Sequence, residues 1–156
     1  MEITMKPIAY ASNQRKEVED DQWGAIVTTI TLAEELPDSA IASIDSFSHL
    51  EVVFYFHKVK EDKIIQGARH PRNNKDYPLT GIFAQRGKNR PNRIGLTTVE
   101  LLEVEGRSMI VKGLDCIDGT PILDIKPVME EFLPKSSLKQ PDWTRDVMRK
   151  YWDTAQ

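Results

Sequence analysis

Six segments of this chain are rich in apolar and β-branched residues that alternate with polar ones or run together. Such segments favour β-strands, because branched and aromatic side chains pack well on a pleated surface. We therefore predict strands at residues 25–32, 50–59, 80–85, 94–104, 108–117 and 122–128. Short connectors containing Gly106 and Gly119 suit tight turns, so we expect consecutive strands to pair in antiparallel fashion.

Helical periodicity is confined to residues 38–47 and 141–152. Two helices are too few to cover both faces of a parallel sheet. The pattern predicts an all-β fold, mainly an antiparallel β-barrel with one or two peripheral helices, and a β-sandwich is the alternative. We assign residues 1–135 to the barrel domain and residues 136–156 to a C-terminal helical tail.

The composition is that of an ordinary globular domain. The chain has 156 residues, of which 40% are hydrophobic and 29% charged, and a chain of about 150 residues can bury roughly two thirds of its extended surface. No apolar run approaches the roughly 18 to 20 residues of a membrane span, and the N-terminus lacks a signal-peptide pattern. With a single cysteine, Cys116, we expect a cytoplasmic protein in which this thiol is buried and structural.

The charge is distributed unevenly. Between Lys58 and Arg93 there are ten Lys and Arg residues and three acids, a net charge of +7, and the overall charge of −3 leaves −10 for the rest of the chain. Such a basic face could steer a polyanion towards the protein, and a solvated loop is the alternative interpretation. The segment 61–78 is long for a loop in a compact domain, which is typical of functional or mobile segments.

Common catalytic signatures are absent from the sequence. There is no G-x-S-x-G, Walker or G-x-G-x-x-G motif, and His49, His57 and His70 lack the paired spacing of a helical zinc site, so we expect no metal. Two dense polar stretches remain, "RGKNRPNRIGL" at 86–96 and "GLDCIDGTPILDIKP" at 113–127. Turn chemistry alone would account for the second stretch, because Asp and Gly are typical turn residues.

These stretches carry a resemblance. "RPNRIGLTTVELLEV" and "GLDCIDGTPILDIKP", preceded by "FSHLEVVFYFH" at 47–57 and "KPIAYA" at 6–11, resemble the TsaA-like domain of the TrmO-type (YaeB-like) methyltransferases, roughly over residues 8–127. The resemblance implies a small β-barrel that binds S-adenosylmethionine, usually as a homodimer. It also implies methylation of N6 of a threonylcarbamoyl-modified adenosine next to the anticodon of tRNA.

The resemblance also implies site residues. The cofactor would contact Gln22, Trp23, His57, Lys58, Arg86, Leu96, Gly113, Leu114, Asp115, Asp118, Gly119 and Thr120. Leu96 and the backbone around Leu114 would enclose the adenine, and Asp115 or Asp118 would accept ribose hydroxyls or lie near the sulfonium. The local density of cations, rather than the resemblance, makes Lys88, Arg90 and Arg93 the residues that we expect to meet an anionic acceptor such as RNA. No residue is assigned as the catalytic proton acceptor.

The chain departs from the family pattern in three places. It has Asp20-Asp21-Gln22 where the family commonly has Pro-Arg-Gln, and Arg93 where a second proline is common. The sequence ends soon after "ILDIKPV", so we expect it to lack the further C-terminal domain that longer members carry. We expect an S-adenosylmethionine-dependent methyltransferase acting on tRNA, and the alternatives are a small-molecule acceptor or a cofactor-binding module without turnover. Trp143, Tyr151 and Trp152 near the chain end predict a homodimer, unless this segment packs on its own barrel.

Overall fold

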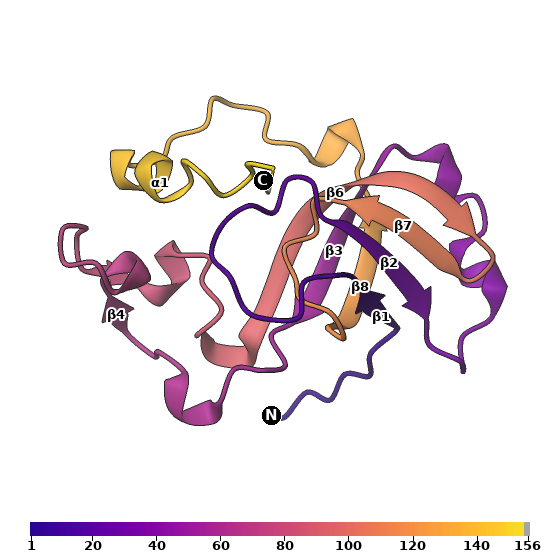
Figure 1. Ribbon diagram of the computed structural model, residues 1–156, viewed down its shortest axis with the longest axis horizontal. Helices are drawn as coiled ribbons and strands as arrows, with labels where there is room; N and C mark the ends of the chain where they lie inside the picture. The colour runs from indigo at the N-terminus through magenta and orange to yellow at the C-terminus, as the bar shows by residue number, and fades with distance from the viewer. Residues whose placement is uncertain (155–156) are drawn as a thin grey trace.

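The computed structural model describes residues 1–154, and six antiparallel strands close into a barrel, on the right in Figure 1. The order around the barrel is β1-β2-β7-β6-β3-β8. The strands are β1 (Ala9–Ser12), β2 (Val27–Leu32), β3 (His49–Tyr55), β6 (Ile94–Glu105), β7 (Ser108–Lys112) and β8 (Pro121–Pro127). The predicted antiparallel barrel is confirmed.

The barrel interior is filled by alternate residues of each strand. Leu50, Val52 and Phe54 of β3 are buried, whereas the residues between them lie towards the outer face. Each large apolar side chain that is fully buried contributes about 1.5–3 kcal/mol. Slipping a strand by one position would expose this whole set, so the alternation fixes the register of the barrel.

Gly95 permits a close approach inside the barrel. It pairs with Phe54 across β6 and β3, and a Cβ at this position would lie 2.5 Å from atoms of the Phe54 ring. That ring meets Phe56 edge to face, with 5.3 Å between the ring centres. A side chain at position 95 would therefore displace an aromatic pair.

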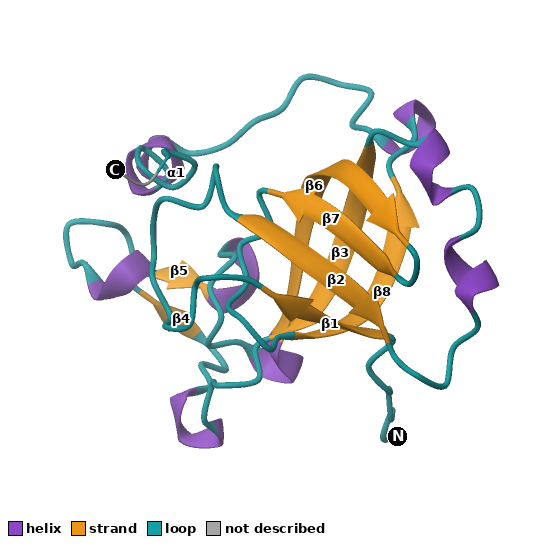
Figure 2. Cartoon of the chain, turned by 45° about the vertical axis from the view of Figure 1, so that its right-hand side comes forward, coloured by secondary structure: helices purple, strands orange, loops and turns teal. Residues whose placement is uncertain are grey.

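A second, two-stranded sheet lies beside the barrel (Figure 2) and consists of β4 (Ala68–Arg69) and β5 (Thr80–Gly81). The predicted strand at 80–85 was wrong, because the strand ends at Gly81 and does not join the barrel. Ile82–Ala84 form a 3-10 helix instead. The Gln85 side-chain amide donates to the carbonyls of Arg69 and Thr80, which folds the turn back onto its own small sheet.

The predicted helices are shorter than expected. Residues 38–47 form two 3-10 helices, Asp38–Ile41 and Ile44–Ser46, because Ser43 between them has a φ of 66°. The C-terminal helix α1 is limited to Asp142–Val147 and turns follow it. The remaining 3-10 helices are Glu61–Lys63, Pro71–Asn73, Pro91–Arg93 and Glu130–Phe132.

Three barrel strands also differ from the sequence prediction. The strand predicted at 50–59 ends at Tyr55, and residues 56–59 belong to the connection that follows it. Strand β1 was not predicted, since it has only four residues and its buried positions are alanines. The strand predicted at 108–117 ends at Lys112, because Gly113 has a φ of +86° and turns the chain out of the sheet. Within residues 1–154, no helix is long and apolar enough to span a membrane. The domain boundary at residue 135 stays a prediction.

Replacing Gly95 tests the close approach to Phe54. We expect Gly95→Ala to lower the free energy of unfolding by about 1–3 kcal/mol, because overpacking a filled core forces side chains and backbone to shift. Urea denaturation measures the change. Gly67→Ala is the control, since a Cβ there meets nothing within 4 Å. Equal stability of the two variants would contradict the packing argument.

Candidate functional site

The strand register brings three connecting segments to one end of the barrel. The segments 13–26, 56–93 and 113–120 join β1 to β2, β3 to β6 and β7 to β8. Because neighbouring strands are antiparallel, the end of β1 lies by the start of β8, the end of β3 by the start of β6, and the end of β7 by the start of β2. The predicted cofactor residues lie on these segments or at the start of β6.

The segment 113–120 crosses this end of the barrel and is anchored by its apolar side. Leu114 and Thr120 are buried, and the Thr120 hydroxyl donates to the Ile117 carbonyl at 2.7 Å. Asp115 and Asp118 stay partly exposed on the other side. Leu114 and Thr120 are therefore core residues that position the segment. The carboxylates of Asp115 and Asp118 are the groups of this segment that a ligand can reach.

Asp118 is held ionised by the neighbouring segment 13–26. Lys16 Nζ lies 2.7 Å from its carboxylate, and the Asn13 backbone N–H donates to it at 3.0 Å. These hydrogen bonds, that of Lys16 first, lower the pKa of Asp118. Lys58 joins the group, because its Nζ donates to the Lys16 carbonyl at 3.2 Å.

His57 lies across from the glycine that follows Asp118. Gly119 has a φ of +80°, and a Cβ on it would lie 4.0 Å from His57 Nε2. Burial, and then the charge of Lys58, lower the pKa of His57 below its ordinary value. The imidazole that faces Gly119 is therefore neutral at pH 7.

Asp115 is fixed by two hydroxyl groups. The Thr97 hydroxyl from β6 donates to one carboxylate oxygen, and the Tyr151 hydroxyl donates to the other. Burial, followed by the Asp115 charge, raises the pKa of Tyr151, so its proton is retained. Thr97 and Tyr151 were not predicted as site residues. The aromatic pair Tyr151-Trp152 near the chain end was the available signal.

The C-terminal segment lies against the site. The backbone N–H groups of Gln22 and Trp23 donate to the carbonyls of Lys150 and Tyr151, at 3.1 and 2.8 Å. Trp152 lies close to Gly24, where a Cβ would overlap its carbonyl. Tyr151 therefore packs on its own barrel, which was the alternative to a role in dimerisation.

Helix α1 continues this contact to the segment 56–93. The Tyr77 hydroxyl donates to Asp146, and the Tyr77 ring lies 6.4 Å from that of Trp143, centre to centre. The C-terminal segment thus bridges the segment 56–93 and the segment 13–26.

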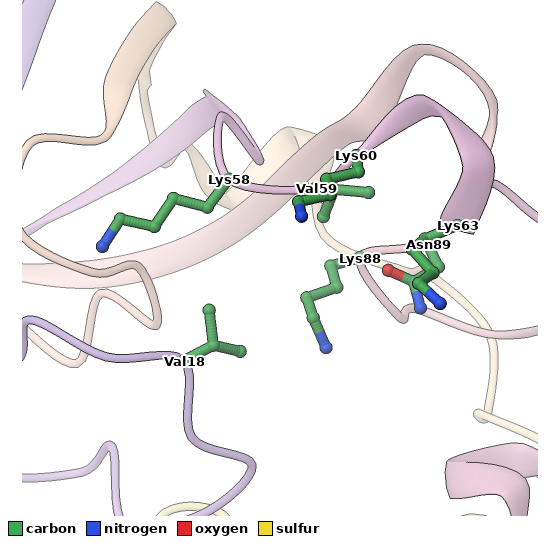
Figure 3. Close-up of a pocket in the computed structure, with 7 residues that line it drawn as sticks. All are labelled: Val18, Lys58, Val59, Lys60, Lys63, Lys88 and Asn89. Atoms are coloured by element: carbon green, nitrogen blue, oxygen red, sulfur yellow. The ribbon is translucent and has the colours of Figure 1, made fainter.

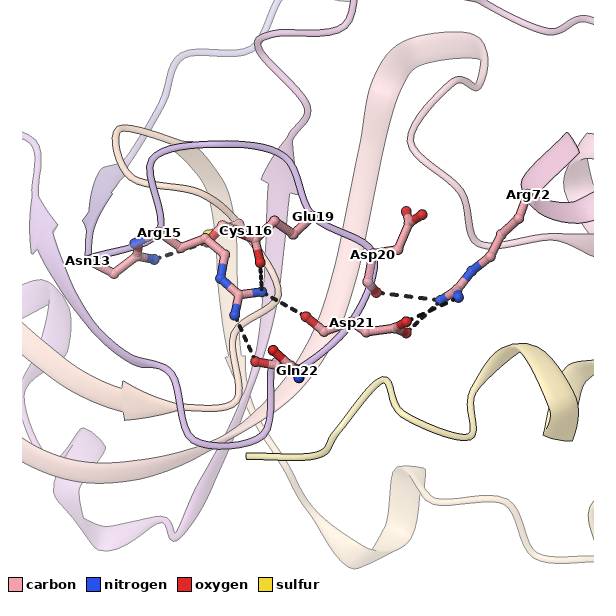
Figure 4. Close-up of polar contacts among 8 residues, drawn as sticks. All are labelled: Asn13, Arg15, Glu19, Asp20, Asp21, Gln22, Arg72 and Cys116. Carbon is pink, nitrogen blue, oxygen red and sulfur yellow. Dashed lines mark hydrogen bonds and ion pairs between the residues drawn. The ribbon is translucent and has the colours of Figure 1, made fainter. Parts of the chain in front are cut away.

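A polar network stiffens the segment 13–26 (Figure 4). The Arg15 guanidinium donates to the carbonyls of Asp21 and Gln22, at 2.8 and 2.9 Å, and stacks 4.3 Å from the buried Trp23 ring. Asp21 stands where the resembling family commonly has arginine, and the Arg72 guanidinium approaches it to 2.8 Å. The aspartate at position 21, where the family pattern has arginine, therefore forms an ion pair with Arg72.

Arg86 and Leu96 meet at the start of β6. The Arg86 side chain donates to the Leu96 carbonyl. The Leu96 side chain is 46% exposed and lies on the outer face of the barrel. Gly113, at the end of β7, lies near the Trp152 ring. Gly113 therefore lies where the C-terminal segment packs, and Arg86 and Leu96 contact each other at the start of β6.

The predicted RNA-binding cations fall into two groups. Arg90 and Arg93 are partly buried and donate to the carbonyls of Gln85 and Val59, at 2.7 and 2.8 Å. Arg93 also lies 5.2 Å from the centre of the Tyr55 ring. Lys88 instead lines a hollow with three other lysines. Their contact with RNA stays a prediction, but both arginines also hold loop structure.

Cys116 is the buried structural thiol that the sequence predicted. It is 4% exposed, and burial raises its pKa to about 12, so it is no nucleophile at neutral pH. Among residues 1–154, no group of three or more His, Cys, Asp or Glu side chains is placed to hold a metal ion.

Gly24→Ala tests the docking of the C-terminal segment. The added Cβ would overlap the Trp152 carbonyl, so we expect the segment to detach and the amide hydrogens of Gln22 and Trp23 to exchange faster. Hydrogen exchange followed by NMR measures this. Gly81→Ala, where a Cβ meets nothing within 4 Å, should leave both amides protected. Unchanged protection in Gly24→Ala would contradict the contact.

Known proteins are similar to this chain in sequence and in fold. The family model of the tRNA-methyltransferase O N-terminal domain matches residues 13–132. A human protein named tRNA (adenine(37)-N6)-methyltransferase is 37% identical over 105 residues, which are 67% of this chain and 23% of that protein. A "Probable S-adenosyl-L-methionine-binding protein" of Pyrococcus abyssi is 32% identical over 136 residues, 83% of this chain and 70% of that protein.

The solved structures agree with the sequence relatives. A crystal structure of TrmO from Pseudomonas aeruginosa superposes with a TM-score of 0.72 and 25% identity, over 92% of this chain and 62% of that one. The chain spans less than a quarter of the mouse and human relatives it matches. By the match over residues 13–132 and the shared fold, this chain belongs to the tRNA-methyltransferase O N-terminal domain family.

Proposed function

We propose that this protein is an S-adenosylmethionine-dependent methyltransferase that modifies N6 of an adenine next to the anticodon of tRNA, the adenine being threonylcarbamoyl-modified. The observation that carries the proposal is the meeting of three segments at one end of the barrel, with Asp115, Asp118 and His57 among them, in a chain of this family. Curated relatives named for tRNA adenine methylation support the acceptor.

The residues at this end of the barrel fit the cofactor by their chemistry. Two partly exposed carboxylates, Asp115 and Asp118, suit ribose hydroxyls and a sulfonium cation. Leu96 offers an exposed apolar side chain for the adenine, and Gly119 leaves space in front of His57. Asp115, Asp118, Leu96 and Gly119 are the residues that we assign to cofactor binding most directly.

The bound cofactor would supply an electrophilic methyl group to the acceptor nitrogen, with the thioether as the leaving group. The contribution of this chain is positioning and exclusion of water. Thr97 and Tyr151 hold Asp115 in one orientation, and Lys16 keeps Asp118 ionised. The Tyr151-Trp152 segment covers one side of the site.

A second candidate function is a cofactor-binding module without turnover. Relatives of Archaeoglobus fulgidus and Pyrococcus abyssi are named only for probable S-adenosyl-L-methionine binding, which supports this alternative. A methyltransferase with a small-molecule acceptor is the third. All three proposals share the cofactor site and differ in the acceptor.

Transfer of labelled methyl from S-adenosylmethionine to tRNA tests the acceptor. We expect label in tRNA that carries the threonylcarbamoyl group and none in tRNA without it, read by nucleoside analysis.

We also expect Asp118→Asn to weaken cofactor binding in calorimetry, on the order of tenfold for one charged hydrogen bond.

Asp124→Asn is the matched control, because Asp124 also pairs with a lysine, Lys126, at 2.5 Å, but lies in β8 on the barrel wall. It should bind the cofactor as the wild type does. Cofactor binding without label in either tRNA would favour a small-molecule acceptor or a binding module. No cofactor binding at all would reject all three proposals.

We also propose that the protein forms a homodimer. The segment 128–141 between β8 and α1, here called the strap, carries Phe132 and Leu138, which are 79% and 77% exposed. Leu133 between them is also exposed. Large apolar side chains gathered on one surface segment often mark association sites. This surface replaces Tyr151 as the basis of the dimer proposal.

Light scattering measures the oligomeric state. We expect twice the chain mass of 17.8 kDa for the wild type, and a monomer for the double variant Phe132→Ser/Leu138→Ser, because polar side chains remove the apolar contact. Lys135→Ser/Lys139→Ser on the same strap is the control and should stay dimeric. A monomeric wild type at working concentrations would reject the dimer.

A further inference from the structure

A hollow lined by four lysines lies next to the candidate site (Figure 3). Its volume is about 290 Å³, and its lining residues are Val18, Lys58, Val59, Lys60, Lys63, Lys88 and Asn89. They come from the segment 13–26 and from two parts of the segment 56–93. In Figure 3 the ends of Lys58 and Lys88 lie on either side of Val18.

The lining carries positive charge without a carboxylate. Among the ion pairs of residues 1–154, none involves Lys58, Lys60, Lys63 or Lys88. The nearest acids in sequence are Glu61 and Asp62, on the 3-10 helix with Lys63, and Glu17 and Glu19, which flank Val18. None of these acids lines the hollow, so four like charges face one another across it.

The walls of the hollow are held in place by the chain itself. The Ile65 backbone N–H donates to the Asn89 carbonyl at 3.0 Å, which joins the two lysine-bearing parts of the segment 56–93. Arg93 donates to the carbonyl of Val59 in one wall, and Arg90 donates to the carbonyl of Gln85 ahead of Lys88 in the other. Two guanidinium groups thus organise the backbone that presents the lysines.

We propose that this hollow is a binding site for the phosphate backbone of the tRNA strand that carries the methylated adenine. The proposal rests on the proposed function. Lysine is a mobile point charge with three donors, which suits contacts to phosphates that carry no sequence information. Lys58, Lys60 and Lys63 are exposed, which fits a strand laid across the hollow better than a small anion enclosed in it.

The hollow adjoins the candidate cofactor site through consecutive residues. Lys58 lines the hollow, and His57 before it faces Gly119 of the segment 113–120. A strand whose phosphates are held by these lysines therefore passes beside the carboxylates of the site. The surrounding chain is acidic, with a charge of −10 outside residues 58–93, and so steers a polyanion towards this face.

The test compares Lys60→Gln/Lys63→Gln with Lys135→Gln/Lys139→Gln, which removes the same charge from the strap after β8. Affinity for tRNA is measured by fluorescence anisotropy over a range of salt concentrations. We expect the first variant to bind tRNA on the order of tenfold more weakly at about 150 mM salt, with a salt slope smaller by about 1 to 2, because each lost phosphate contact removes about 0.7–0.9 of slope. The second variant should match the wild type, and both should bind S-adenosylmethionine normally.

The outcomes separate this proposal from the proposed function. Methyl transfer to tRNA by the wild type, with equal tRNA affinity and equal salt slope in the two variants, would reject the hollow as the tRNA-binding site and keep the proposed function. No methyl transfer, with weaker RNA binding only in Lys60→Gln/Lys63→Gln, would reject the proposed function and keep the hollow as an RNA-binding site alone. Binding of tripolyphosphate that depends on these lysines, without any effect on tRNA, would show a small-anion site and also overturn the proposal.

Discussion

Closure of the barrel is the constraint on which the rest of the structure depends. Strand β8 pairs with β1 on one side and with β3 on the other, so both the first and the last strand must meet in antiparallel register. With that closure, the connections 13–26, 56–93 and 113–120 leave the barrel at the same end. Residues separated by up to 105 positions, such as Asn13 and Asp118, then form direct hydrogen bonds.

The barrel could be predicted from sequence because alternation is a local signal. The strands around Val52, Val99 and Val111 bury every second residue, and this pattern needs no knowledge of distant partners. The strand expected at 80–85 failed for the opposite reason. Its composition is that of a strand, but the Gln85 amide binds carbonyls of its own small sheet.

The candidate site was less predictable than the fold. The resemblance indicated the segment 113–120, but nothing in the sequence pairs Asp115 with Tyr151, 36 positions away. The number of cations in the sequence also does not show which role each one has. Arg90 and Arg93 donate hydrogen bonds to backbone carbonyls, because the guanidinium group presents several donors in a fixed plane. Lys58 and Lys88 instead line a hollow.

The segments 13–26 and 56–93 and the C-terminal segment are linked in a ring of contacts. Arg72 joins Asp21 of the segment 13–26, Tyr77 joins Asp146 of α1, and Tyr151 returns to Trp23. In a closed ring, moving one segment strains its contacts with the other two, so local opening is cooperative and all three segments behave as one unfolding unit. An acceptor too large for the closed arrangement would have to open the whole ring, and the combined free energy of these contacts would then be the cost of its entry.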